Sequence, residues 1–333
     1  MATTRSAADR FARFTWLTLG YNLAVIAWGA FVRATGSGAG CGSHWPTCNG
    51  QVIPRDPSLE TIIEFTHRAT SGIALLMVVA MLWWARRLWP AGHRVRVATW
   101  AAMGFMLLEA AIGAGLVKFE LVADNDSMAR ALTLGAHLIN TQFLIAAIGL
   151  AGWYATGRSA PSRARLGQHG WWIVLGALAM MTIGMTGAIA SLGDTLFPAR
   201  SLSHGLAQDL DPTSHLLLRL RIWHPTLAVV LGTGLALLGW FAPRRQESAD
   251  VARAGRALAA MVLVQWSIGL VTLITLVPVP LQLLHLLSAD VLWLAFAWLA
   301  ATVLAAQDEV GRTSPAMSIA DSRSNTDPAP SAR

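Results

Sequence analysis

Long apolar segments recur eight times along the chain, and they constrain its fold more than any other feature. A helix of about 20 apolar residues crosses the roughly 30 Å hydrocarbon core of a bilayer. Backbone polar groups find no water in lipid, so such segments form helices. We predict spans at 14–34, 62–86, 96–118, 130–155, 170–192, 215–241, 255–277 and 280–306. The chain is therefore expected to be an all-α polytopic membrane protein, and its 54% of hydrophobic and 13% of charged residues agree with that class.

Basic residues are unevenly distributed over the loops, which predicts the side that each loop faces. The loops after the second, fourth and sixth spans carry Arg86, Arg87, Arg94, Arg96, Arg158, Arg163, Arg165, Arg244, Arg245, Arg253 and Arg256. The other loops carry only Arg55, Lys118, Arg130 and Arg200. Both termini are thus expected in the cytoplasm, with no cleavable signal peptide at 1–13. This asymmetry explains the net charge of +7, so no nucleic-acid partner is expected.

An internal repeat divides the chain into two halves. "WGAFVRATGSG" (28–38) is similar to "MTGAIASLGD" (185–194), and "EAAIGAGLV" (109–117) to "QWSIGLVTL" (265–273). We predict two four-helix bundles, 1–157 and 158–306, related by a pseudo-twofold axis along the membrane normal. The remainder, 307–333, is rich in Ser, Pro, Asp and Arg and is predicted to be a disordered cytoplasmic tail.

Four histidines lie inside predicted spans at a common depth: His67, His137, His224 and His285. Each lies about six to ten residues into its span, or roughly 10–15 Å below the outer edge at ~1.5 Å per residue. One intramembrane histidine alone usually hydrogen-bonds a neighbouring helix. Four at matched depth, in repeat-related positions, favour metal ligation, because two facing imidazoles suit the axial positions of haem iron. We predict two porphyrin sites, one per half, toward the outer face.

The segment "EFTHRATSG" makes the two halves unequal. It places Glu64 one helical turn before His67, whereas the matching position in the second half is Arg221. An acid near one predicted iron and a base near the other indicate chemistry in one half and a held cofactor in the other. The sequence leaves an alternative open, in which Glu64 is a structural partner of Arg68.

Arginines near the predicted outer face are candidates for binding haem propionates, because guanidinium binds carboxylate bidentately. Snorkelling to the interface accounts for their positions equally well. The candidates are Arg33, Arg68, Arg219 and Arg221.

Cys41 and Cys48 share one loop. Because that loop is predicted to lie outside, a disulfide between them can persist. A reactive redox dithiol is the alternative.

The run "GAFVRATGSGAGCGSHWPTCNGQVIP" (29–54), then "EFTHR" (64–68), then His137, His224 and His285, resembles the haem A synthase family over roughly 14–306. The loop is similar to the bacterial form, in which the cysteine pair is redox-active or disulfide-bonded. The chain departs from the family pattern at His44, where many members carry Asp or another polar residue, and at Glu109, where Gln is common.

The resemblance implies an oxidoreductase acting on a CH group, with haem O as its substrate. The C8 methyl would become the formyl group of haem A, for terminal oxidases, by two hydroxylations and a dehydration. His224 and His285 would hold a resident haem b, His67 and His137 the substrate haem, and Glu64 would be the catalytic carboxylate. The implied setting is a bacterial cell membrane, with haem O synthase and a redox donor or acceptor as partners. Small lipid-facing residues would permit a homo-oligomer.

Two other classes of protein were weighed. A bis-His dihaem membrane electron-transfer protein explains the four histidines equally well, but neither Glu64 in one half only nor the paired cysteines. A transporter built from parallel repeats would place polar groups at the midplane. The polar groups predicted here lie toward the outer face, so the transporter ranks last.

Overall fold

The structure is a computed structural model that describes residues 2–159, 161–241 and 248–305. Eight of its helical segments are long and apolar enough to cross a membrane: Ala7–Ala34, Leu59–Leu88, Arg94–Lys118, Met128–Ala155, Arg165–Leu196, Leu216–Phe241, Ala249–Ile274 and Val279–Ala305. No strand occurs among the described residues. The predicted all-α, eight-span architecture is confirmed, with ends that differ from the predicted ones by several residues.

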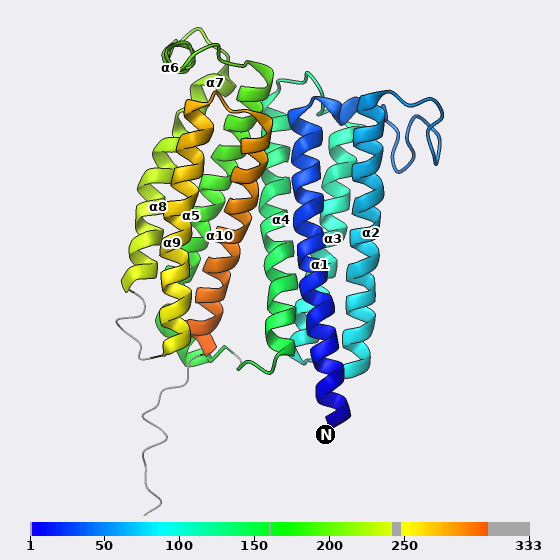
Figure 1. Cartoon of the computed structure of the whole chain (residues 1–333), viewed down its shortest axis with the longest axis vertical. Coiled ribbons are helices and arrows are strands. Elements are labelled where there is room, and N and C mark those ends of the chain that lie inside the picture. The colour runs from blue at the N-terminus through cyan, green and yellow to red at the C-terminus, as the bar shows by residue number, and fades with distance from the viewer. Residues whose placement is uncertain (1, 160, 242–247, 306–333) are drawn as a thin grey trace, which may run out of the picture.

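The elements follow one another as α1 (Ala2–Ala34), η1 (Ser37–Ala39), α2 (Leu59–Leu88), α3 (Arg94–Lys118), α4 (Met128–Ala155), α5 (Arg163–Leu196), α6 (Leu202–Leu210), α7 (Leu216–Arg221), α8 (Trp223–Phe241), α9 (Ala249–Ile274) and α10 (Val279–Ala305). Helices α1 to α4 pack on one another, and α5 packs with α7, α8 and α10, which in turn contacts α9 (Figure 1). The two groups meet where α4 touches α5 and α10, and α1 touches α10. The predicted boundary near residue 157 falls in the α4–α5 connection, whereas the twofold relation stays a prediction.

Serine caps explain where two of the spans begin. The hydroxyl groups of Ser58 and Ser127 accept hydrogen bonds from the backbone N–H groups of Thr61 and Arg130, at the starts of α2 and α4. An N-terminal serine oxygen satisfies a donor that the helix itself leaves unpaired. These spans therefore begin where the polar loops end.

The predicted span 215–241 is interrupted at Ile222, between α7 and α8. Pro225 has no N–H, so it cannot donate to the carbonyl of Arg221, and it lies in the first turn of α8, where that loss is tolerated. The short helix α6 was not predicted. The predicted tail at 307–333, and Arg244 and Arg245, lie outside the described residues.

Hydrogen bonds across the interface tie the two groups of helices together. The guanidinium of Arg33 on α1 donates to the carbonyl of Ser191 (2.9 Å), the hydroxyl of Thr195 (2.8 Å) and the amide oxygen of Gln282 (3.0 Å). The indole of Trp293 on α10 donates to a backbone carbonyl of α4 at 2.6 Å. Among the spans, α4 and α10 are the most buried. The interface is therefore a specific contact between central helices.

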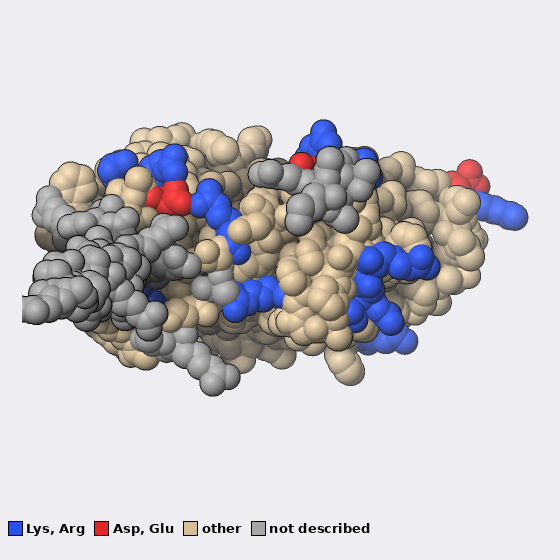
Figure 2. All heavy atoms as spheres, turned by 90° about the horizontal axis from the view of Figure 1, so that it is seen from below, with Lys and Arg blue, Asp and Glu red and all other residues tan. Residues whose placement is uncertain are grey.

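Basic side chains gather at the end of the molecule that carries the N-terminus (Figure 2). Arg86 and Arg87 end α2, and each lies over a tryptophan ring, of Trp100 and Trp83 respectively. The disulfide loop lies at the opposite end of the helices (Figure 1). The distribution of basic residues predicts that this end faces the cytoplasm. Which side of the membrane each end faces stays a prediction.

We expect the disulfide loop and the basic end to lie on opposite sides of the membrane. In a background without cysteines, Val52→Cys in the loop should react with a membrane-impermeant maleimide in intact cells. Ala91→Cys, in the α2–α3 connection, should react only after lysis, and both positions are exposed. The reverse labelling pattern would show that the topology is inverted.

Candidate functional site

The loop between α1 and α2 is closed by a disulfide between Cys41 and Cys48, both fully buried. The predicted pairing is thus confirmed as a disulfide. The backbone of this loop packs tightly on α2, because a Cβ at Gly40 would come within 2.5 Å of the carbonyl oxygen of Glu60. The hydroxyl of Thr61 donates to the carbonyl of Gly40 at 2.7 Å.

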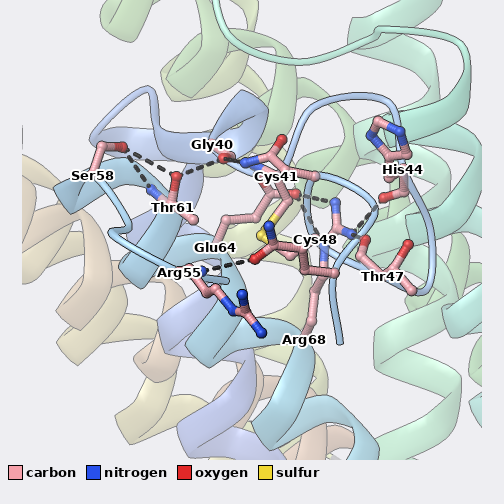
Figure 3. Close-up of a disulfide and its surroundings, with 12 residues drawn as sticks. Gly40, Cys41, His44, Thr47, Cys48, Arg55, Ser58, Thr61, Glu64 and Arg68 are labelled. Atoms are coloured by element: carbon pink, nitrogen blue, oxygen red, sulfur yellow. Dashed lines mark hydrogen bonds and ion pairs between the residues drawn. A yellow bond between two sulfur atoms is a disulfide. The ribbon is translucent and has the colours of Figure 1, made fainter. Parts of the chain in front are cut away.

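Glu64 is the residue that connects the disulfide loop to α2 (Figure 3). One carboxylate oxygen accepts from the backbone N–H of Cys41 at 2.8 Å, and the other accepts from Arg68 at 3.1 and 2.5 Å. Arg68 in turn donates to the carbonyls of His44 (2.6 Å) and Thr47 (2.7 Å). Glu64 is 3% exposed. The structure therefore shows the pairing with Arg68 that the sequence left as an alternative, and it fixes the carboxylate one turn from His67.

Arg221 plays the corresponding part in the second half, with the opposite charge. Its guanidinium donates to Asp209 (2.8 Å) and Asp194 (2.7 Å), and to the carbonyl of Gly205 (3.1 Å). Asp209 and Gly205 belong to α6, so Arg221 holds the connection between α5 and α7 against the helices as Glu64 holds the disulfide loop in the first half. Two carboxylates already neutralise Arg221, which leaves little of its charge for a propionate.

The other predicted propionate partners differ in their surroundings. Arg68 is occupied by Glu64 and loop carbonyls, whereas Arg33 donates only to uncharged groups across the interface. Arg219 is exposed. Arg130, which the charge pattern predicts only as a loop residue, is 3% exposed. Its Nη1 donates to the carbonyls of Ala123 (2.5 Å) and Asn125 (2.8 Å), and its Nε has no hydrogen-bond partner among the described residues.

His224 and His285 face one another across the second half. Their ring centroids lie 6.2 Å apart, with the ring planes at 86°. A metal–imidazole bond is about 2 Å long, so two rings on opposite sides of one metal have centroids roughly 6 Å apart. The pair therefore fits axial ligation of a haem iron.

Glycines of neighbouring helices lie against three of the four rings. A Cβ at Gly187 would come 2.9 Å from Cε1 of His224, and one at Gly269 would come 3.0 Å from Cε1 of His285. A Cβ at Gly29 would come 2.8 Å from Cε1 of His67. All three glycines belong to the repeat segments. The repeat therefore includes the small residues that leave room for these imidazole rings.

In the first half, His67 lies on α2 and His137 on α4. Nδ1 of His67 is buried and makes no hydrogen bond among the described residues, whereas Nδ1 of His137 lies beside a carboxylate. A buried nitrogen without a partner suits a ring whose bonding is completed by another group. Within the described residues, no three His, Cys, Asp or Glu side chains converge as a metal site.

Sequence reasoning missed a polar residue beside one histidine of each pair. Oε1 of Glu109 on α3 lies 3.2 Å from Nδ1 of His137, and Nε2 of Gln265 on α9 lies 3.3 Å from both ring nitrogens of His285. The signal was present, because the two aligned repeat segments begin at Glu109 and Gln265.

Comparison with known proteins shows the family to which the chain belongs. A family model, COX15-CtaA, described as "Cytochrome oxidase assembly protein", matches residues 12–297. The chain belongs to the COX15-CtaA family. This membership agrees with the resemblance to haem A synthases, and it makes haem the group to be tested at the paired histidines.

Individual relatives match over different lengths. The chain is 46% identical over 297 residues to a Thermus thermophilus protein named "Protoheme IX farnesyltransferase", covering 89% of the chain and 49% of that protein. It is 33% identical over 135 residues to "Heme A synthase" of Exiguobacterium sibiricum, covering 40% of the chain and 43% of the relative. It is 43% identical over 107 residues to "Heme A synthase" of an Exiguobacterium species, covering 32% and 35%. The chain thus spans about half the length of the Thermus relative.

The glycine contact predicts a selective effect on the second histidine pair. Gly187→Ala would push the His224 ring at a cost of about 1–3 kcal/mol, so the purified protein should retain less haem. The matched control is Gly167→Ala on the same helix, where a Cβ would meet nothing within 4 Å. An unchanged haem spectrum in Gly187→Ala would contradict a ligand role for the ring beside it.

Proposed function

We propose that this chain is a haem A synthase, which oxidises the C8 methyl of haem O to a formyl group. The observation that carries the proposal is the presence of four histidines in the membrane spans, two per group of helices, in a COX15-CtaA chain. The names of the Exiguobacterium relatives support it. The reaction proceeds by two successive hydroxylations and a dehydration.

His224 and His285 hold a resident haem b in the proposal. Their centroid separation of 6.2 Å and the glycines beside both rings support this role. When bound there, haem b supplies one-electron transfer. Arg221 contributes indirectly, since it holds the outer loop over this half.

His67 and His137 bind the substrate, haem O, in the first half. Arg33 and Arg130 lie toward the outer ends of α1 and α4, and neither forms an ion pair among the described residues. Buried guanidinium groups without a paired carboxylate suit the propionates of the substrate. Arg68 and Arg219 remain weaker candidates, because the first is occupied and the second is exposed.

Glu64 carries the catalytic role in the proposal. Oxidation of the methyl group builds positive charge on the carbon beside the macrocycle. A carboxylate held rigidly by Arg68 and by the N–H of Cys41 can stabilise that charge or accept the released proton. The disulfide then has a structural part, because it fixes the loop that orients Glu64.

A haem O synthase is the proposed supplier of substrate. The region that matches this chain makes up about half of the Thermus protein, which is named "Protoheme IX farnesyltransferase". One polypeptide containing both parts would pass a farnesylated haem directly between them. The proposed setting is the bacterial cell membrane, with the sites toward the outer face and a redox partner that accepts or supplies electrons.

Glu64→Gln tests the reaction in cells that make haem O but no haem A. The amide keeps the shape of the carboxylate and loses its charge, so we expect haem O or its hydroxylated derivative to accumulate while haem b is retained. Chromatography of extracted pigments measures the products. Glu60→Gln, an exposed position one turn earlier, is the matched control and should still yield haem A.

Two outcomes would count against this assignment. If Glu64→Gln makes haem A at the normal rate, Glu64 is only a structural partner of Arg68. If the unchanged protein yields haem b alone, at two per chain, the electron-transfer alternative replaces the enzyme. Protection of both cysteines from alkylation before reduction verifies that the loop of each variant is intact.

The histidine pairs should separate by substitution. His224→Ala or His285→Ala should remove the resident haem b or convert it to a high-spin form, whereas His67→Ala should leave it low-spin. His204→Ala, exposed on α6, is the control for histidine loss in general. A low-spin haem b spectrum that survives in both His224→Ala and His285→Ala would assign that haem to other residues.

A further inference from the structure

The polar neighbour of the second histidine carries a different charge in each half. In the first half, the Glu109 carboxylate lies 3.2 Å from Nδ1 of His137. Its oxygens also receive the amide of Asn140 and the hydroxyl of Thr141, each at 2.5 Å. The Asn140 amide donates to the carbonyl of Phe105 as well, which fixes the orientation of its NH₂ group.

In the second half, the neutral amide of Gln265 occupies the same place. It lies 3.3 Å from the ring nitrogens of His285 and 3.2 Å from the carbonyl of that residue. The hydroxyl of Ser288 donates to its oxygen. Ser288 follows His285 by three residues, as Asn140 follows His137. In both clusters, a residue of the preceding helix lies beside the histidine and accepts a hydrogen bond from the residue three positions after that histidine. A carboxylate oxygen faces the His137 ring, and an uncharged amide nitrogen faces the His285 ring.

We propose that Glu109 is a positioning residue that makes His137 a more strongly electron-donating ligand than His285. The inference rests on the proposed function, in which both histidines ligate haem iron. A carboxylate near the second nitrogen of a ligating imidazole orients the ring and raises the basicity of the ligand. An amide carries no net charge, so it raises the basicity of the ligand less.

The consequence is a difference in reduction potential between the two sites. Negative charge beside a ligand stabilises the ferric over the ferrous state, and hydrogen bonding around the ligands is one of the means by which a protein sets haem potential. The first-half haem should therefore have the lower potential, so a shared electron rests preferentially on the second half. Division of labour between the halves thus extends from Glu64 to the ligands themselves.

Reciprocal substitution tests the idea in full-length purified protein loaded with hemin. Glu109→Gln should raise the ferrous-to-ferric ratio of the first-half haem about tenfold at a fixed potential, which is about 59 mV for one electron. Gln265→Glu should lower the potential of the second-half haem in the same way. Spectroelectrochemical titration measures both haems, and His67→Ala, which removes the first-half signal, assigns them.

The outcomes separate this inference from the function on which it rests. If both haems bind and neither substitution moves its potential, Glu109 is a packing residue and the inference fails while the haem sites stand. If no hemin binds in the first half of the unchanged protein, the proposed function itself fails. If Glu109→Gln does not fold, the shift or constancy in Gln265→Glu decides, because that variant introduces the charge instead of removing it.

Discussion

A glycine of a neighbouring helix lies against each of three imidazole rings, and the arrangement of both halves depends on this contact. Lipid offers an imidazole no hydrogen-bond partner, so the ring must lie between helices, and small residues let two helix backbones approach closely. A side chain at Gly29, Gly187 or Gly269 would occupy the space of the ring itself. His137 is the exception, and there Glu109 is the neighbouring group. A glycine on one helix thus makes room for a histidine of another at three of the four positions.

Charged residues of opposite sign close the end of each half that carries the disulfide loop or α6. Glu64 binds a backbone N–H of the disulfide loop, and Arg221 binds a backbone carbonyl and a carboxylate of α6. A buried charge is costly unless it is paired and hydrogen-bonded, and both residues meet that requirement through the loop that they hold. The sign of the charge can therefore differ between the halves, and each residue still binds its loop to the helices. This freedom allows one half to carry an acid where the chemistry is proposed.

The spans and the histidines could be predicted from sequence because each depends on a local or repeated pattern. The partners of those residues could not. Glu109 contacts His137 because of the rotation of α3 about its own axis, which turns the Glu109 face toward α4. Hydropathy does not predict that rotation. Helix α6 was missed because its short polar sequence is typical of a loop, and it is stabilised by contact with Arg221. The choice between Arg68 and a substrate as the partner of Glu64 likewise depends on where the loop folds back.

The contact between the halves bears directly on how the two sites communicate. One histidine of each pair lies on a central helix, His137 on α4 and His285 on α10, and these two helices pack against each other. The Trp293 indole donates to an α4 carbonyl, and Arg33 of α1 donates to groups of α5 and α10, so these bonds hold the two groups of helices against each other. A rearrangement that separated the sites would have to break these buried hydrogen bonds, each of which leaves a costly unpaired group behind. In the proposed function, the distance between the two haem irons is therefore fixed by the fold, and the direction of electron flow is left to the ligands and their neighbours.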